Sequence, residues 1–517
     1  MNITILDSKN GEKTVKINDI YIHSSYNPTS EAKKFCQTLD FNINPAVIFV
    51  IEPGLSYLYS NLKEKFPNSK IGIIRFTKEF EKYNKDWDFS LNYFDLEFNT
   101  NPKNGRVKAL SKACLDRTYS FTDKFEHSIT QYFSESELCS SVFVNWNPTL
   151  KIFEDLNKSL WKKIKLIIEN SRTILITRQY FEKKWLINTC NSLKYANTYK
   201  LEKINPNNKD VLIVASGPSL GKVINTIKEN RKNLFIICLS SAISALKFFK
   251  IEPDIYLSTD GGFWAGEHLK KIRFNQNIPL ILPIESYCKK QILQKNQIVL
   301  CSYNDGISKE ILDFNNFHFL TLERNGTISG TALEFAKKIT TNNIFCAGLD
   351  LQGSKGFQHI LPNEIETNNS IKSNKIKSTE TFQSASRYNT KSLSIYRDWF
   401  INYKNTNKTY RIIEDENNKP LGQIQDISTL DFSKKINKST KIESYKIVKN
   451  NVQINNQELI NFIKENITKE KWQTTLFPLD YVAKNNAKSE EQIDFFENKI
   501  KERTIKLLNK IQEILNE

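Results

Sequence analysis

Small polar residues follow several apolar segments in the second half of the chain. Serine hydroxyls and backbone amides can bind a phosphate or a sugar hydroxyl, and glycine lets the backbone approach such a ligand closely. Residues 216–220 read Ser-Gly-Pro-Ser-Leu, and the amides that open the helix expected after them would attract an anion. We predict a nucleotide- or substrate-binding set that consists of Ser216, Gly217, Ser219, Ser240, Asp260, Ser329 and Gly330.

These residues lie in a region, from about residue 211 to residue 359, that alternates short apolar strands with helices. Its strand segments, among them VLIVAS, NLFIICLS, FHFLTL and NIFCAGLD, are continuously apolar, which is typical of a parallel sheet covered on both faces. The pattern predicts a doubly wound, Rossmann-like α/β fold. Ligands of such sheets bind outside the carboxyl ends of the strands, where the candidate residues fall.

The chain of 517 residues is too long for one ordinary core, and we expect it to divide. The expected parts are an N-terminal α/β accessory domain over 1–150, a helical connector over 151–205, a Rossmann-like catalytic domain over 206–400 and a mainly helical C-terminal domain over 401–517. Within the last, Ile493, Ile500 and Leu507 belong to an apolar stripe at a/d-like spacing. This stripe packs either against the protein's own core or against a second copy in a homo-oligomer.

Two segments outside the strand pattern are also informative. In the accessory domain, a strand at 47–51 is followed by a Pro-Gly turn, a helix at about 55–65 and a strand at 71–76. A phosphate-binding loop needs several glycines and this one offers only Gly54, so we interpret the domain as structural. The polar segment 351–390 has too few apolar residues to pack by itself, and we expect a mobile loop there that could cover an active site.

Composition excludes several classes of protein. The net charge of +17 favours anionic ligands, but the lysines are dispersed and not interleaved with aromatic residues, so we expect no nucleic-acid partner. No apolar run approaches the roughly 20 residues of a membrane span, and the amino terminus lacks a secretory signal pattern. We therefore expect a cytoplasmic protein. Its eight cysteines are scattered singly, so neither a zinc site nor a disulfide framework is indicated.

The chain carries, in this order, the segments ASGPSL, IEPDIYLSTD, ISGTALEFAKK and AGLDL, the last followed by His359. This ordered set resembles the motility-associated factor (Maf) family, whose members are regarded as glycosyltransferases of bacterial flagellin. The central region also resembles the family 42 bacterial sialyltransferases, which have a similar Gly-Pro-Ser-Leu loop. The resemblance implies transfer of a nonulosonic acid, such as pseudaminic, legionaminic or a sialic acid, from a CMP-sugar to Ser or Thr hydroxyls of flagellin during motility-related glycosylation.

The transfer that the resemblance implies requires a base, because the acceptor hydroxyl must lose its proton. Histidine is the natural candidate near neutral pH, and the chain has five: His23, His127, His268, His318 and His359. His318 falls in an apolar segment and is expected to be a packed core residue, whereas His268 is a reserve candidate. His359 lies just beyond Asp350, beside the expected cleft. We predict that His359 is the base and that Asp350 belongs to the same catalytic site.

The expected cofactor requirement is none beyond the CMP-activated sugar. Asp254 and Asp260 lie at opposite ends of one strand and cannot both face one ion, and a single phosphate can be held by hydroxyls and amides. Two other functions stay open. The central region also resembles MptE-like pterin diphosphokinases, which would transfer a pyrophosphoryl group, and a non-catalytic flagellin-binding or assembly factor could keep the same fold.

Overall fold

A computed structural model describes residues 2–93, 98–100, 121–202, 209–272, 277–352, 357–378, 391–403, 408–414, 418–438 and 446–517. The chain forms two compact units. The N-terminal unit comprises residues 1–180 and 470–505, and the central unit comprises residues 181–469 and 506–517. Two long helices, α6 (Glu154–Tyr195) and α20 (Glu490–Asn516), contribute residues to both units.

The central unit is built on an 11-stranded sheet in the order β18-β17-β16-β10-β11-β12-β13-β14-β9-β19, with β15 paired to β14. Among the described pairings only β19 with β9 is antiparallel. The strands are β9 (Thr198–Glu202), β10 (Asp210–Val214), β11 (Leu234–Leu239), β12 (Ile255–Leu257), β13 (Leu280–Pro283), β14 (Ile298–Ser302), β15 (Leu320–Thr321), β16 (Ile344–Ala347), β17 (Thr409–Ile412), β18 (Gln425–Ile427) and β19 (Lys446–Lys449). The predicted doubly wound α/β fold is confirmed.

Strand order creates a topological switch point in this sheet. β10 pairs with β11 on one side and with β16 on the other, and both pairings are parallel. The chain therefore leaves β10 in one direction and returns on its opposite side, which opens a crevice at the carboxyl ends of the two strands. Val211 and Ile213 of β10 are completely or almost completely buried, because helices cover the sheet on both faces.

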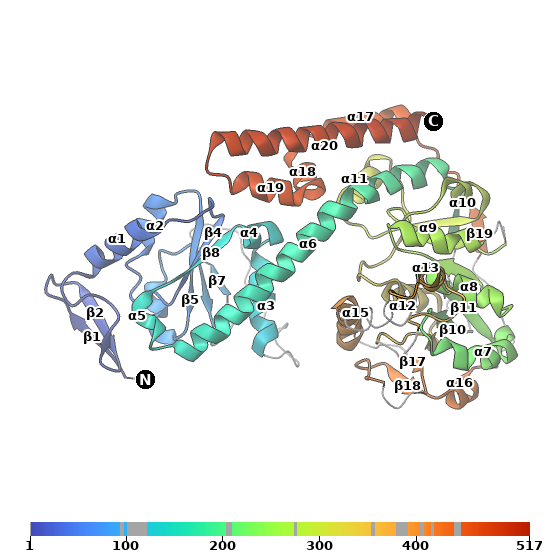
Figure 1. The fold of residues 1–517 in the computed structure, drawn as a ribbon, viewed down its shortest axis with the longest axis horizontal. Coiled ribbons are helices and arrows are strands. Elements are labelled where there is room, and N and C mark those ends of the chain that lie inside the picture. Colours follow the sequence, from blue (N-terminus) through green and yellow to red (C-terminus); the bar gives the residue numbers. More distant parts are fainter. Residues whose placement is uncertain are drawn as a thin grey trace. The chain divides into compact units, whose positions relative to one another are not determined.

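Helices connect these strands and surround the sheet (Figure 1). Helix α12 packs through Ala332, Leu333 and Ala336 on the buried side chains of β10, β11 and β16. The helices of this unit are α7 (Leu220–Glu229), α8 (Ile243–Phe248), α9 (Phe263–Leu269), α10 (Lys290–Lys295), α11 (Gly306–Phe314), α12 (Ile328–Ile339), α13 (Glu364–Ile371), α15 (Lys391–Asn402), α16 (Thr429–Lys435) and α17 (Asn456–Asn466).

Three features of the central unit differ from what the sequence led us to expect. The polar segment after residue 351 contains helix α13, which Asn363 caps by accepting a hydrogen bond from the amide of Ile365. β17 and β18, from the region expected to be mainly helical, extend the central sheet. The expectation of a packed core His318 is wrong: the strand begins only at Leu320, and His318 is exposed.

The N-terminal unit contains two sheets. A three-stranded antiparallel sheet has the order β1-β2-β3, and a five-stranded sheet has the order β7-β6-β5-β4-β8, in which only β6 with β7 is antiparallel. The strands are β1 (Ile3–Asp7), β2 (Lys13–Ile17), β3 (Ile20–Tyr21), β4 (Val47–Ile51), β5 (Lys70–Arg75), β6 (Phe89–Asn92), β7 (Phe98–Thr100) and β8 (Ser141–Asn145).

Its helices are short, apart from the shared α6 and α20. They are α1 (Pro28–Thr38), α2 (Tyr59–Lys65), the 3-10 helix η1 (Lys78–Tyr83), α3 (Phe121–Tyr132), α4 (Glu135–Cys139), α5 (Asn147–Leu150), α18 (Glu470–Leu476) and α19 (Pro478–Asn485). The apolar stripe of α20 packs on the protein itself, with Ile500, Leu507 and Ile511 buried. No described helix is long and apolar enough to cross a membrane.

A buried histidine anchors the loop that follows β4. His23 is 1% exposed, and its Nε2 accepts a hydrogen bond from the amide of Leu55 at 2.8 Å. Burial, together with the charge of Arg75, lowers the pKa of His23 to about 3. His23 is therefore neutral in the native protein, and in this contact Nε2 serves as the acceptor.

We predict that the N-terminal unit loses stability in mild acid because of His23. The unfolded histidine takes up a proton near pH 6.5 and the buried one only near pH 3, so unfolding binds a proton between these values. The free energy of unfolding should fall by roughly 3 kcal/mol more in the wild type than in His23→Gln when pH is lowered from 7 to 4. Urea unfolding followed by tryptophan fluorescence measures this; identical pH slopes would contradict it.

Candidate functional site

A pocket of about 620 Å³ opens at the switch point between β10 and β16. Its lining comes from the loops after β10, β11 and β16, from the start of α12, from the loop before α13 and from α15. Of the residues predicted from the sequence, the pocket lining includes Ser216, Gly217, Ser329, Asp350 and His359. Other polar side chains that line it are Ser241, Thr327, Gln352, Gln358 and Tyr396.

Hydrogen bonds tie the loop after β10 to its neighbours. The amide of Gly217 donates to the carbonyl of Gly348 at 2.8 Å, and the carbonyl of Ser216 accepts from the amide of Ile360 at the same distance. Ser216 Oγ also lies 2.9 Å from Ser241 Oγ and donates to it. Hydrogen bonds thus connect the loops after β10, β11 and β16 along the rim of the pocket. The bond of Ile360 to Ser216 holds the neighbouring His359 next to this rim.

Asp350 is directed toward the start of helix α7. Its carboxylate accepts hydrogen bonds from the amide of Ser219 at 3.0 Å and from the hydroxyl of Ser219. A negative side chain at a helix amino terminus is favourable for the same reason that an anion would be. The amide of Ser219 is therefore occupied by Asp350 and is not available to a ligand. Ser219 itself does not line the pocket.

Gly217 is required by packing. A Cβ at this position would lie 2.5 Å from the carbonyl oxygen of Gly348 and 2.6 Å from Cγ of Asp350. Gly348 has φ of +70°, and a Cβ there would lie 2.4 Å from the carbonyl oxygen of Ala215. The two glycines let the loops after β10 and β16 touch, which closes the floor of the pocket.

A buried carboxylate orients His359. Glu366 lies on α13, its side chain is 4% exposed, and its Oε1 is 2.9 Å from His359 Nδ1. The same oxygen accepts the amides of Gln358 at 3.0 Å and His359 at 3.2 Å. A hydrogen bond from Nδ1–H to this carboxylate leaves Nε2 as the acceptor. Glu366 was not among the predicted site residues.

The reserve histidine has a similar partner but lies outside the pocket lining. His268 is 5% exposed, and its Nδ1 is 2.6 Å from Glu364 Oε2. Burial raises the pKa of Glu364, but hydrogen bonds from His268 and Ser244 outweigh it and leave that pKa lowered. Helix α13 therefore holds two histidines through two carboxylates, and only His359 faces the pocket at the switch point.

The structure separates three further predicted residues from the pocket lining. Ser240 is buried in a 3-10 turn, and its neighbour Ser241 lines the pocket instead. Gly330 is buried where a Cβ would lie 2.8 Å from Asn325 Oδ1, so its role is to admit that side chain. Asp260 is exposed, and its carboxylate accepts a hydrogen bond from the amide of Gly262 at 2.9 Å.

Asp260 still influences the pocket through its charge. Burial and the nearby carboxylate of Asp260 together raise the pKa of Tyr396, whose side chain lines the pocket from α15. A phenol with a raised pKa stays protonated at neutral pH and can donate a hydrogen bond. Gln358 Nε2 is a second donor: it is buried and has no hydrogen-bond partner among the described residues.

The described lining therefore offers an anion only neutral hydrogen-bond donors. It contains no lysine or arginine, and its titratable side chains are Asp350, His359 and Tyr396. In the part of the chain that the structure describes, no three His, Cys, Asp or Glu side chains cluster as ligands of a metal ion would. The arrangement can bind a ligand of low charge and remove a proton from a hydroxyl at His359.

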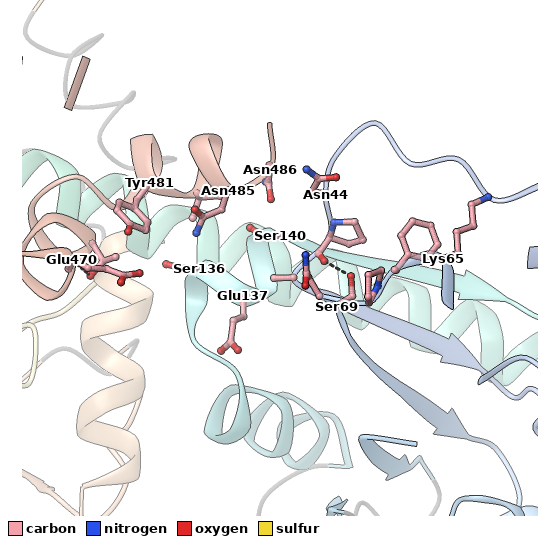
Figure 2. A pocket seen from close by; sticks show the side chains of 17 residues that line it. Asn44, Lys65, Ser69, Ser136, Glu137, Ser140, Glu470, Tyr481, Asn485 and Asn486 are labelled. Atoms are coloured by element: carbon pink, nitrogen blue, oxygen red, sulfur yellow. Dashed lines mark hydrogen bonds between the residues drawn. The ribbon is translucent and has the colours of Figure 1, made fainter. Parts of the chain in front are cut away.

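A second polar pocket, of about 490 Å³, lies within the N-terminal unit between α19 and α4 (Figure 2). Its side chains serve the fold. Lys65 Nζ binds the carbonyls of Cys36, Gln37 and Leu39 at the end of α1. Glu137 pairs with Lys70 and completes a capping box with Ser134. We therefore place the candidate site in the central unit.

Comparisons with known proteins give a family match within the central unit. The family model "6-hydroxymethylpterin diphosphokinase MptE-like" matches residues 183–356. An uncharacterized protein of Treponema pallidum is 31% identical over 303 residues, which cover 57% of this chain and 65% of the relative. The match thus spans less than two thirds of that relative's length.

Among solved structures, a Maf glycosyltransferase from Magnetospirillum magneticum AMB-1 is similar in fold. The TM-score is 0.54 at 12% sequence identity, and the similarity covers 99% of this chain and 90% of the other. The fold is therefore similar to that of a Maf glycosyltransferase, as the sequence motifs indicated, and residues 183–356 of the central unit are similar to the MptE-like family model.

We predict that Gly217→Ala destabilises the central unit by about 1–3 kcal/mol, because the added Cβ overlaps Gly348 and Asp350. Gly221 is the matched control, since a Cβ there would only touch Ile360 Cδ1 at 3.7 Å. Chemical denaturation of both variants measures the effect. Equal unfolding midpoints for Gly217→Ala and the wild type would show that the floor of the pocket is not tightly packed.

Proposed function

We propose that this chain is a glycosyltransferase that moves a nonulosonic acid from a CMP-sugar to Ser or Thr hydroxyls of flagellin. The observation that carries the proposal is His359 in a switch-point pocket, with its Nδ1 held by the buried carboxylate of Glu366. The fold similarity to a Maf glycosyltransferase supports the reaction class. The donor, the sugar and the acceptor are parts of the proposal.

The proposed reaction needs one proton acceptor and one good leaving group. Nε2 of His359 takes the proton of the acceptor hydroxyl while its oxygen bonds to the anomeric carbon of the sugar. The bond between that carbon and the phosphate oxygen breaks, and CMP leaves with the electron pair. Glu366 stabilises the imidazolium that forms, as a carboxylate does when it accepts the Nδ1–H of a catalytic histidine.

The pocket fits a nucleoside monophosphate better than a highly charged ligand. Neutral donors such as Ser216, Ser329 and Gln358 can hold one phosphate, whereas a triphosphate needs cations to offset its charge. The volume of about 620 Å³ lies in the range of small-molecule sites. Asp350, through Ser219, positions the loop that presents Ser216 and Gly217.

The match to the MptE-like family model favours one alternative, pyrophosphoryl transfer from ATP to a pterin. That reaction needs a magnesium site of clustered carboxylates. Asp350 is engaged by Ser219, and Asp260 lies outside the pocket lining. The transferase therefore accounts for more of the described geometry.

We predict that replacing His359 abolishes transfer and preserves donor binding. His359→Gln should lower the rate of CMP release in the presence of flagellin roughly 100-fold or more, because the base is lost. Glu366→Gln should also lower it, because the amide is neutral and no longer stabilises the imidazolium. Mass spectrometry of flagellin measures the product. His318→Gln, an exposed site, is the control, and full activity of His359→Gln would remove His359 from the mechanism.

We predict that CMP binds to the purified protein more tightly than ATP does, because the pocket lining offers hydroxyl and amide donors without a cation. Titration calorimetry with each nucleotide, with and without Mg²⁺, measures the difference. Magnesium-dependent ATP binding stronger than CMP binding would favour the diphosphokinase. Flagellin binding without any sugar transfer, by an otherwise folded protein, would favour the non-catalytic assembly factor.

A further inference from the structure

The N-terminal unit has a switch point of its own. β4 pairs with β5 on one side and with β8 on the other, and all three strands are parallel. A pocket of about 870 Å³ lies by the segments that follow β4 and β5. Its walls include Leu55, Ser56 and Tyr57 from the loop after β4, and Lys82 and Tyr83 from η1 after β5. One end of the pocket thus lies beyond the carboxyl ends of β4 and β5, beside the switch point, because no described residue that follows β8 (Ser141–Asn145) lines it. Its other end reaches Lys63 of α2 and Asp88, which precedes β6.

A fully buried ion pair joins the two walls. Arg75 and Glu52 are both 0% exposed, and Arg75 Nη1 donates to Glu52 Oε1 at 2.8 Å. Nη2 of the same guanidinium donates to Ser56 Oγ at 2.8 Å, and its Nε donates to Asn84 Oδ1 at 3.0 Å. Arg75 thus connects the loop after β4 with the segment just past η1.

The ion pair of Arg75 and Glu52 holds the loop after β4 in a backbone conformation that is unfavourable by itself. Glu52, Gly54 and Ser56 have φ of +42°, +57° and +72°, so three of five successive residues lie in the left-handed region. For the two that are not glycine this conformation is sterically unfavourable, and it persists only where the surroundings enforce it. Glu52 Oε2 also accepts a hydrogen bond from the amide of Phe76 at 2.6 Å, which ties the loop to the end of β5. The wall at Leu55–Tyr57 is therefore rigid before any ligand arrives.

The lining combines aromatic rings with lysines. Tyr57, Tyr59 and Tyr83 line the pocket, and a base or other flat ring can stack on such side chains. Lys63, which pairs with Asp88 at 3.4 Å, and Lys85 also line it. Lys82 is exposed and has no carboxylate partner among the described residues, and its Nζ lies 5.2 Å from the centre of the Tyr83 ring.

Acidic side chains offset only part of this charge, and the lining keeps a formal excess of one positive charge. Asp88 also accepts a hydrogen bond from the hydroxyl of Tyr59 at 3.2 Å and from the amide of Ile71 at 2.8 Å, so its carboxylate is already satisfied. Asp86 is exposed at the rim. Three lysines face two carboxylates, in a chain whose net charge is +17.

We propose that this pocket binds a mononucleotide, with the base between tyrosine rings and the phosphate on Lys82. The site would bind the phosphate through a lysine side chain, whereas a glycine-rich loop binds it through backbone amides. It therefore does not need the several glycines that the loop at Gly54 lacks. It is separate from the pocket at the switch point of the central unit, and the proposal does not depend on the function proposed for that pocket.

Hydrogen–deuterium exchange of the full chain, with and without AMP or CMP, tests the proposal. We expect protection of residues 52–60 and 78–88 on addition of nucleotide, which distinguishes this pocket from the one in the central unit. Lys82→Glu should raise the nucleotide concentration that gives half-maximal protection about tenfold, which corresponds to about 1.4 kcal/mol of binding free energy. Lys78→Glu, on the same 3-10 helix but outside the pocket lining, should leave it unchanged.

Three outcomes would overturn the proposal. One is the absence of protection in these residues at millimolar AMP and CMP, whatever happens in the central unit. Another is equal protection in Lys82→Glu and the wild type. The third is equal protection by inorganic phosphate alone, because the tyrosine rings would then contribute nothing. A thermal melt of each variant shows that it is folded, and Lys82→Ala replaces Lys82→Glu if the latter is not.

Discussion

The close approach of the loops after β10 and β16 is the constraint on which the central site depends. Parallel pairing of these strands places Ala215 beside Ala347, and two glycines, Gly217 and Gly348, let the backbones touch beyond that point. This contact brings Asp350 to the start of α7 and anchors the loop that carries His359. Without it, the serines and the histidine would be distributed over separate loops of a large sheet.

Both units of the protein use the same solution to hold polar groups at a sheet edge. In the central unit a buried carboxylate, Glu366, fixes the His359 side chain and the backbone around it. In the N-terminal unit the buried pair of Glu52 and Arg75 fixes a loop with unfavourable φ angles. Each buried charge is satisfied by several partners, since an unpaired charge in such a position would be strongly destabilising. Rigid walls therefore surround pockets that differ in charge.

Much of the fold followed from local sequence patterns, and the exceptions have physical causes. Continuous apolar runs identified β10, β11 and β16, because buried parallel strands need no alternation. His318 was misplaced because an apolar run does not reveal where a strand begins, and α13 was missed because its stability comes from a cap and from buried Glu366, with little apolar surface. Two residues of the site were not predicted: Ser241 follows the predicted Ser240, and Glu366 lies seven residues beyond the predicted His359.

The sequence by itself determined the succession of strands and helices, and with it the edge of the sheet where polar residues gather. These are consequences of hydrophobic periodicity and of turn-forming residues, which act over a few positions. Only the tertiary structure decided that Asp350 binds Ser219, that Glu366 orients His359 and that Arg75 reaches Ser56 and Asn84. Such contacts join residues that are 7 to 131 positions apart in the chain, and their partners are selected by packing.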